Sequence, residues 1–156
     1  MFGKGGLGRL FYESTRGDMD KKRIWVAVGV VENAAGQVFI CRRSDGQHQA
    51  GKWEFPGGKV EAGETMPAAL ARELAEEIGI EVQQSEPLLQ IEHDYPDKSV
   101  LLDVWRVTAF SGQPYGREGQ SALWVDRQSL LEYEFPEANH PITERVMAMV
   151  PHGCAD

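Results

Sequence analysis

Residues 57–80, GGKVEAGETMPAALARELAEEIGI, decide the fold, because they predict a glycine turn that leads into a single helix. Thr65 is a good N-cap residue, Pro67 fits the first helical turn, and Gly79 is a natural C-terminal stop. These signals predict a helix over Met66–Ile78, about three to four turns long.

The two faces of this helix differ in chemistry. An apolar stripe recurs every four residues and is expected to face the core: Leu70, Leu74 and Ile78. The opposite face carries three carboxylates within one turn, at the spacing i, i+3, i+4: Glu73, Glu76 and Glu77. Such carboxylates repel one another unless a hard dication lies among them, and Mg²⁺ and Mn²⁺ prefer carboxylate oxygen. Taken alone, the triplet also fits a solvated acidic face.

Strand-like segments surround the helix. Ile24–Val31 is apolar and β-branched, and the turn residues Asn33–Gly36 lead into Val38–Arg42, which predicts a β-hairpin. Further strands are expected at Trp53–Phe55, Leu88–His93, Val100–Ala109 and Trp124–Val125, and a closing helix at Ile142–Val150. Strands mixed with two helices, without regular βαβ repetition, predict an α/β or α+β fold with a mixed β-sheet.

Length and composition favour one domain. A chain of 156 residues with 42% hydrophobic and 26% charged residues can bury a sizeable core. We expect residues 1–20, which are Gly-rich and aperiodic, to be a flexible extension, residues 21–151 to form the domain, and residues 152–156 a tail. No window approaches the length of a membrane span. Cys41 and Cys154 have no metal-ligand spacing and form no disulfide framework, so we expect reduced thiols in a cytoplasmic protein, with a monomer as the default.

The charge balance limits the class of ligand. The net charge is −8, and beyond Arg23 there are ten basic and 21 acidic residues, a net charge of −11. A body this acidic is not expected to bind a nucleic acid polymer through a general electrostatic surface. It can bind a small polyphosphate if a divalent cation lies between its carboxylates and the phosphate oxygens.

The pattern over residues 58–80 is G-x5-E-x7-R-E-L-x-E-E-x-G-I, and it closely resembles the 23-residue motif of the Nudix hydrolases. Flanking segments are similar to the MutT-type members: A-V-G at 27–29, R-R at 42–43, E-F-P-G-G-K at 54–59, G-R-E-G-Q at 116–120 and F-P-x-A-N-x-P at 135–141. The resemblance implies a mixed sheet between helices. It also implies hydrolysis of 8-oxo-dGTP to the monophosphate and pyrophosphate, by water attack at the β-phosphorus.

The same resemblance implies roles for particular residues. The metal ligands for Mg²⁺, with Mn²⁺ as a substitute, would be the Gly57 carbonyl and four carboxylates: Glu73, Glu76, Glu77 and Glu118. Glu73 is our choice of general base, since Arg72 adjoins it and could orient it, and Glu118 is the alternative. Glu64 is expected to orient the junction of loop and helix without binding the metal.

Four residues are candidates for substrate binding: Arg43, His48, Phe55 and Asn139. Arg43 would hold phosphate, with a solvated arginine at the end of its strand as the alternative, and His48 is either a phosphate-side residue or an exposed loop histidine. Phe55 either lines the base pocket or is a core aromatic. Oxidation at C8 turns guanine N7 from an acceptor into an N–H donor, so the Asn139 amide could accept from N7–H while donating to O6. The alternative for Asn139 is a turn-forming role in a Pro-rich loop.

Two other functions remain open on the sequence. The motif builds a metal site and not a base pocket, so another nucleoside triphosphate, ADP-ribose or another nucleotide sugar, or a dinucleoside polyphosphate could be the substrate. A non-catalytic nucleotide-binding module is the remote alternative, because such a module need not keep its metal carboxylates.

Overall fold

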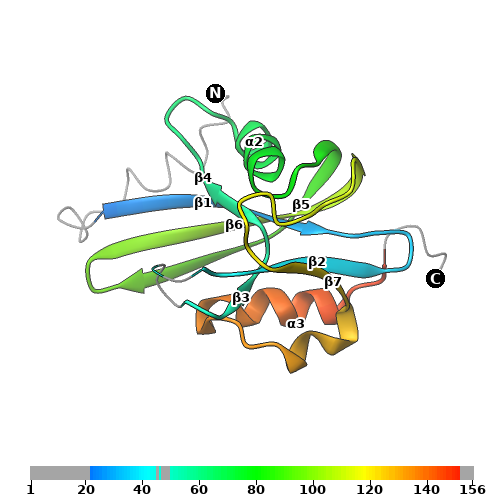
Figure 1. Ribbon diagram of the computed structural model, residues 1–156. Coiled ribbons are helices and arrows are strands. Elements are labelled where there is room, and N and C mark those ends of the chain that lie inside the picture. The colour runs from blue at the N-terminus through cyan, green and yellow to red at the C-terminus, as the bar shows by residue number, and fades with distance from the viewer. Residues whose placement is uncertain (1–21, 45, 47–49, 152–156) are drawn as a thin grey trace.

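The structure is a computed structural model that describes residues 22–44, 46 and 50–151 (Figure 1). The expected extension at residues 1–20, the tail at 152–156 and His48 lie outside the described residues, so those expectations stay predictions. No helix in the described part of the chain is long and apolar enough to cross a membrane.

Seven strands form two sheets. The four-stranded sheet has the order β4 (Gly57–Lys59), β1 (Lys22–Val31), β6 (Lys98–Ser111) and β5 (Glu81–Tyr95). Its central pair, β1 and β6, is parallel, and the two outer pairs are antiparallel. The three-stranded antiparallel sheet has the order β3 (Trp53–Glu54), β2 (Gln37–Arg42) and β7 (Ala122–Asp126).

Helix α2 (Met66–Ile78) lies on one side of the strands and α3 (His140–Ala148) on the other, as Figure 1 shows. Two 3₁₀ segments, η1 (Arg127–Glu132) and η2 (Glu137–Asn139), lead into α3. The expected architecture, a mixed sheet between helices, is confirmed, with the strands divided between two sheets.

Alternation along β1 produces two separate cores. Ala27 and Val31 are buried in the cluster that contains the apolar face of α2. Val28 and Val30 point the other way and are buried in the cluster that contains α3. Because successive side chains of a strand face opposite sides, one apolar strand anchors both helices.

The predicted bounds of α2 are confirmed. The Thr65 hydroxyl accepts from the Ala68 N–H at 3.3 Å, which satisfies a free donor of the first turn. Gly79 adopts φ 74°, and its N–H donates to the Ala75 carbonyl. Glycine adopts this left-handed conformation without steric cost, so the helix ends at Gly79 and the chain continues into β5.

The predicted β-hairpin of Ile24–Val31 with Val38–Arg42 is wrong. β1 and β2 belong to different sheets, and one isolated antiparallel bridge joins Glu32, just after β1, to Val38 in β2. Both edges of β1 are already paired, with β4 on one side and β6 on the other. The predicted turn after β1 is present, but the strands that pair with β1 are β4 and β6, which lie further along the chain.

Strand β5 is longer than predicted, because its first half is polar. Residues 81–87 read EVQQSEP and form the outer strand of the sheet, with register shifts near Gln84 and Pro87. An edge strand with one exposed side lacks a clear apolar alternation, and proline is tolerated at an edge.

Helix α2 approaches β1 closely at Gly29. A Cβ at Gly29 would lie 3.0 Å from Leu74 Cδ1 and 3.3 Å from Leu70 Cδ1, both in fully buried side chains. The Gly29 N–H also donates to the Pro56 carbonyl at 2.8 Å, where the chain passes from β3 to β4. Gly29 therefore sets the separation of helix and sheet.

We expect Gly29→Val to reduce the free energy of unfolding by about 1–3 kcal/mol, because the added methyl groups overpack a close contact. Chemical denaturation would measure this, with Gln90→Val at an exposed strand position as the control. A Gly29→Val protein as stable as wild type would show that α2 can shift away from the sheet at little cost.

Candidate active site

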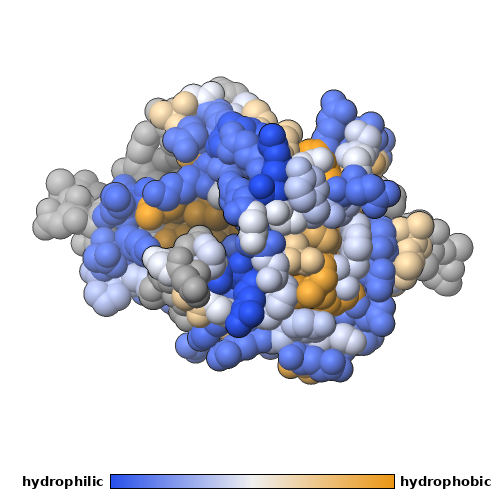
Figure 2. Space-filling view, in the orientation of Figure 1, coloured by the Kyte–Doolittle hydropathy of each residue, from blue (hydrophilic) through white to orange (hydrophobic). Residues whose placement is uncertain are grey.

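A pocket of about 430 Å³ lies where the chain crosses from β3 in one sheet to β4 in the other. It gathers most of the predicted site residues: Arg43, Phe55, Gly57, Glu73, Glu77, Glu118 and Asn139. In Figure 2 this region is a hollow with a hydrophobic floor and hydrophilic residues around it. Arg72 and Glu76 do not line it.

The floor of the pocket is apolar. It is made by alternate residues of β1 and β6: Ile24, Val26, Val28, Val100 and Leu102. Phe55 forms part of the wall and stacks on Phe135, with ring centroids 5.4 Å apart and planes at 25°. Phe55 is also buried in the core, so its position fits a core aromatic as well as a residue that lines a pocket. A flat apolar surface of this kind suits an aromatic base.

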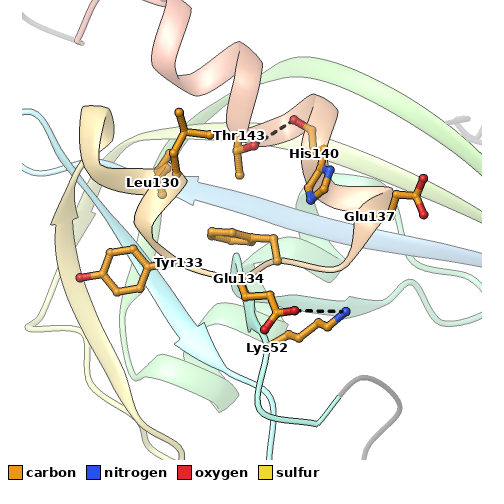
Figure 3. Close-up of a pocket in the computed structure, with 9 residues that line it drawn as sticks. Lys52, Leu130, Tyr133, Glu134, Glu137, His140 and Thr143 are labelled. Carbon is orange, nitrogen blue, oxygen red and sulfur yellow. Dashed lines mark hydrogen bonds and ion pairs between the residues drawn. The ribbon is translucent and has the colours of Figure 1, made fainter.

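A second pocket of about 290 Å³ is lined by Phe135, whose ring stacks on Phe55 of the first pocket (Figure 3). Lys52 and Glu134 form an ion pair across it at 3.9 Å, and Thr143 donates to the His140 carbonyl at 2.9 Å. None of the predicted site residues that the structure describes lines this pocket. We therefore centre the site on the first pocket.

Two glycines let the helix carboxylates reach the pocket. A Cβ at Gly57 would overlap the Ala27 carbonyl oxygen, and a Cβ at Gly58 would overlap the Glu73 carboxylate. Glu77 Oε1 accepts from the Gly57 N–H at 2.8 Å. The glycine pair thus leaves this part of β4 without side chains, and the carboxylates of Glu73 and Glu77 lie against its backbone.

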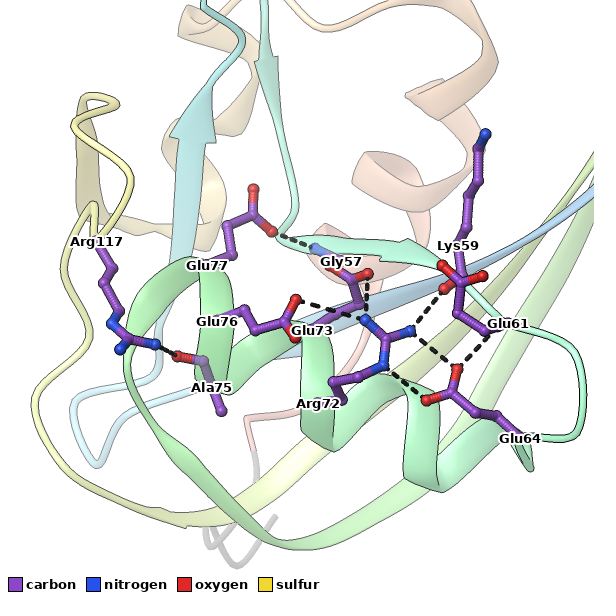
Figure 4. Close-up of polar contacts among 10 residues, drawn as sticks. All are labelled: Gly57, Lys59, Glu61, Glu64, Arg72, Glu73, Ala75, Glu76, Glu77 and Arg117. Atoms are coloured by element: carbon purple, nitrogen blue, oxygen red, sulfur yellow. Dashed lines mark hydrogen bonds and ion pairs between the residues drawn. The ribbon is translucent and has the colours of Figure 1, made fainter.

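Arg72 holds Glu73 in place, as Figure 4 shows. Its guanidinium donates to Glu64 through Nε at 2.6 Å and Nη2 at 2.9 Å, and through Nη1 to Glu73 at 2.9 Å. It also donates to the Lys59 carbonyl at 3.0 Å. The pKa of Glu64 is lowered, chiefly by its hydrogen bond to Arg72. These contacts fix the positions of the loop and of the Glu73 carboxylate; the assignment of Glu73 as general base stays a prediction.

The ionised form of Glu77 is not balanced by the protein alone. Burial, followed by the nearby carboxylates of Glu54, Glu118 and Glu73, raises its pKa to about 8, against a lowering effect of the Gly57 N–H. Burial also raises the pKa of Glu73, although Arg72 opposes the rise. A concentration of buried carboxylates is stabilised by a bound cation.

Glu76 differs from its two neighbours. Its side chain is 55% exposed, whereas that of Glu73 is 18% exposed, and it faces Arg72 at 3.5 Å. A position three residues along a helix is rotated by about 300°, so Glu76 lies to the solvent side of the Glu73–Glu77 row. Its assignment as a metal ligand stays a prediction.

The donor set fits a hard divalent cation. Glu73, Glu77, Glu118 and the Gly57 backbone all border one pocket and offer only oxygen ligands, which Mg²⁺ and Mn²⁺ prefer. Within the described residues, no three His, Cys, Asp or Glu side chains already converge in a geometry that could hold a metal ion. Glu73 accepts from Arg72 and Glu77 accepts from the Gly57 N–H, each through one of its two carboxylate oxygens.

Sequence reasoning missed Glu54 at this site. Glu54 lines the pocket and forms an ion pair with Arg43, and burial raises its pKa against the effect of that arginine. Its signal was present in the motif E-F-P-G-G-K, but only the pairing of β3 with β2 brings it to Arg43. Tyr95 and Lys98, at the tip of the β5–β6 hairpin, also border the pocket. No sequence motif indicated that these two residues belong to the site.

Asn139 reaches the pocket from the end of η2, immediately before α3. Its side chain makes no capping hydrogen bond to α3, so the amide is not used to start the helix. This position favours a binding role over a purely turn-forming one.

The architecture and the acidic helix at a glycine-rich strand edge define a phosphoanhydride hydrolase of one known class. Residues 27–145 match the NUDIX domain, and the chain belongs to the Nudix family. It is 43% identical to an 8-oxo-dGTP diphosphatase of Haemophilus influenzae, over 83% of this chain and 95% of that protein. It is also 34% identical to a CTP pyrophosphohydrolase of Escherichia coli, over 82% of this chain and 94% of that protein.

A solved MutT structure, from a study of the Aliivibrio salmonicida and Vibrio cholerae proteins, is similar in fold. The TM-score is 0.73 at 45% sequence identity, and the match covers 81% of this chain and 98% of that one. The expected resemblance to MutT-type Nudix hydrolases is therefore confirmed.

We expect Glu77→Gln to stabilise the protein in EDTA at pH 8, since glutamine can still accept from the Gly57 N–H but carries no charge. A raised folded-state pKa means that the ionised Glu77 destabilises the fold increasingly as the pH rises from about 4.5 to about 8. The gain in Tm over wild type should therefore shrink toward pH 5. Added Mg²⁺ should raise the Tm of wild type more than that of the variant.

Thermal unfolding with and without Mg²⁺ measures both effects, and Glu144→Gln, at an exposed position of α3 that does not line the pocket, is the control. A Glu77→Gln protein that is less stable than wild type in EDTA at pH 8 would contradict the assignment of unbalanced charge to Glu77.

Proposed function

We propose that this Nudix enzyme hydrolyses 8-oxo-dGTP to 8-oxo-dGMP and pyrophosphate with Mg²⁺, and so removes an oxidised nucleotide from the DNA precursor pool. The observation that carries the proposal is the shared pocket: Asn139 borders the same apolar-floored cavity as the carboxylates Glu73, Glu77 and Glu118. The 43% identical relative that is an 8-oxo-dGTP diphosphatase supports it.

Recognition of the oxidised base would use the Asn139 amide. Its oxygen accepts from N7–H of 8-oxoguanine while its nitrogen donates to O6. Unmodified guanine offers two acceptors at those positions, so the amide oxygen would lose its donor. A site that depends on such a pairing can discriminate by about 10⁴-fold. The apolar floor and Phe55 would bury the faces of the base.

The phosphate end would use the acidic part of the pocket. Glu73, Glu77 and Glu118, with the Gly57 carbonyl and Glu76 as further ligands, would hold Mg²⁺. When bound there, the cation neutralises phosphate charge and makes a nearby water more acidic. Arg43 would donate to phosphate oxygens, with Glu54 holding its guanidinium.

In the reaction, Glu73 takes a proton from a water as the water oxygen bonds to the β-phosphorus. The bond from that phosphorus to the oxygen bridging the α- and β-phosphates breaks, and the nucleoside monophosphate leaves with the electron pair. Burial raises the pKa of Glu73, which improves it as a proton acceptor, and Arg72 fixes its direction. Phosphoryl transfer needs mainly such positioning and charge neutralisation.

The CTP pyrophosphohydrolase relative favours a second candidate, hydrolysis of a different nucleoside triphosphate by the same metal site. A cytosine has neither N7 nor O6, so in this candidate Asn139 would not make the contact that distinguishes the oxidised purine. A non-catalytic module is disfavoured, because Glu73, Glu76, Glu77 and Glu118 are all present.

We further propose a cytoplasmic monomer that binds no nucleic acid polymer. The net charge of −8 supports the last point. Cys41 is buried, and burial, followed by the nearby charge of Glu77, raises the pKa of its thiol. Both observations support a reduced cysteine at this position.

We expect Glu73→Gln to lower kcat by about 10²–10⁴-fold at saturating Mg²⁺, because it removes the proton acceptor without removing bulk. Glu118→Gln under the same conditions is the comparison, and far-UV circular dichroism checks the fold. If Glu118→Gln loses far more kcat than Glu73→Gln, the base is Glu118.

The substrate is tested by kcat/KM for 8-oxo-dGTP beside dGTP, CTP and ADP-ribose, with products identified. We expect a preference of orders of magnitude for 8-oxo-dGTP, and we expect Asn139→Ala to lose that preference while changing dGTP turnover little. Equal losses on 8-oxo-dGTP and dGTP would contradict the role of Asn139, and faster CTP turnover would favour the second candidate.

A further inference from the structure

The loop between β6 and β7 is docked on the C-terminal end of α2. The N–H groups of Tyr115 and Arg117 donate to the carbonyls of Ile78 and Glu77, each at 3.1 Å. The Arg117 side chain donates through Nη1 to the Ala75 carbonyl at 2.9 Å. The last carbonyls of a helix have no partner within the helix, and this loop supplies partners for them.

Gln120 makes a different kind of contact in this loop. Its Nε2 donates to the Glu77 carbonyl at 3.1 Å, and its Oε1 accepts from the Glu118 N–H at 3.0 Å. One side-chain amide therefore joins the backbones of two acidic residues that come from separate elements. An amide has one donor end and one acceptor end, so both contacts are made in only one orientation.

The backbone around Gln120 is shaped to keep this bridge. The Gly119 N–H donates to the Gly116 carbonyl at 3.0 Å, which closes a turn around Glu118. A Cβ at Gly116 would overlap the Gln120 carbonyl oxygen. The turn is therefore tight enough that a shift of Gln120 also moves Glu118.

We propose that Gln120 is a positioning residue, whose amide sets the distance between the backbones of Glu77 and Glu118 so that both carboxylates reach one cation. Gln120 does not line the pocket, so it acts through these two residues and not on the nucleotide. The inference rests on the proposed metal-binding role of Glu77 and Glu118. It explains why Glu118, on an otherwise exposed loop, borders the same pocket as the helix carboxylates.

The first experiment is a Mn²⁺ titration of the full chain without nucleotide, followed by electron paramagnetic resonance. We expect Gln120→Met, which keeps the side-chain length but makes neither hydrogen bond, to weaken Mn²⁺ binding by about 10-fold. Gln120→Ala repeats the test with a smaller side chain. Arg117→Ala is the matched control: it removes a contact from the same loop to the same helix end, but not one to Glu118, and should bind Mn²⁺ within about two-fold of wild type.

A double-mutant cycle separates positioning from general support of the loop. We expect Gln120→Met to weaken Mn²⁺ binding much less in a Glu118→Gln background, because the residue it positions is already changed. We also expect kcat at fixed Mg²⁺ to fall more than KM for the nucleotide rises.

Wild-type Mn²⁺ affinity in both Gln120 variants, or the same loss with and without Glu118, would overturn the inference while leaving the proposed metal site in place. If Glu118→Gln alone binds Mn²⁺ as wild type does, the metal role of Glu118 is wrong and the inference falls with it. The preference for 8-oxo-dGTP over dGTP is a separate measurement and decides neither result.

Discussion

The close approach of α2 to the bare edge of β4 is the constraint on which the rest of the structure depends. At Gly57 the backbone lies against the Ala27 carbonyl, and at Gly58 it lies against the Glu73 carboxylate, so neither position has room for a Cβ. The helix packs its apolar face on one side of the sheet, whereas the pocket floor belongs to the other side. Because no side chain stands between them, Glu73 and Glu77 reach over the edge into that pocket.

This approach concentrates negative charge, and the protein balances it unequally. Arg72 neutralises Glu73 and Glu64, and Arg43 pairs with Glu54. Glu77 accepts one hydrogen bond, from the Gly57 N–H, and is buried near several other carboxylates, so its pKa is raised. The site is thus arranged so that the uncompensated charge lies where a cation and a polyphosphate would meet. An overall charge of −8 does not prevent binding of an anionic substrate when the cation is bound locally.

Helix α3, which begins just after Asn139, is held by a separate network. Arg127 is buried and donates to the Gly36 and Val146 carbonyls at 3.0 and 3.3 Å and to Glu32 at 3.1 Å, so it ties α3 to the turn after β1. Arg106 pairs with the same glutamate. Removing one partner from such a buried cluster would leave an uncompensated charge. These contacts therefore hold the C-terminal part of α3 to Glu32, the residue that follows β1.

The sequence by itself determined α2, its caps and the spacing of its acids, because helix signals and i, i+4 neighbours lie within one segment. It also indicated the family and seven of the residues that border the pocket. Only the tertiary structure decided which strands pair: β1 joins β6 and β4, and not β2, because strand pairing depends on distant edges and not on the intervening turn. For the same reason only the tertiary structure brought Glu54 to Arg43 and docked the loop of Glu118 on the end of α2. The outward direction of Glu76 likewise depends on how α2 is rotated against the sheet, which the Leu70 and Leu74 contacts at Gly29 set.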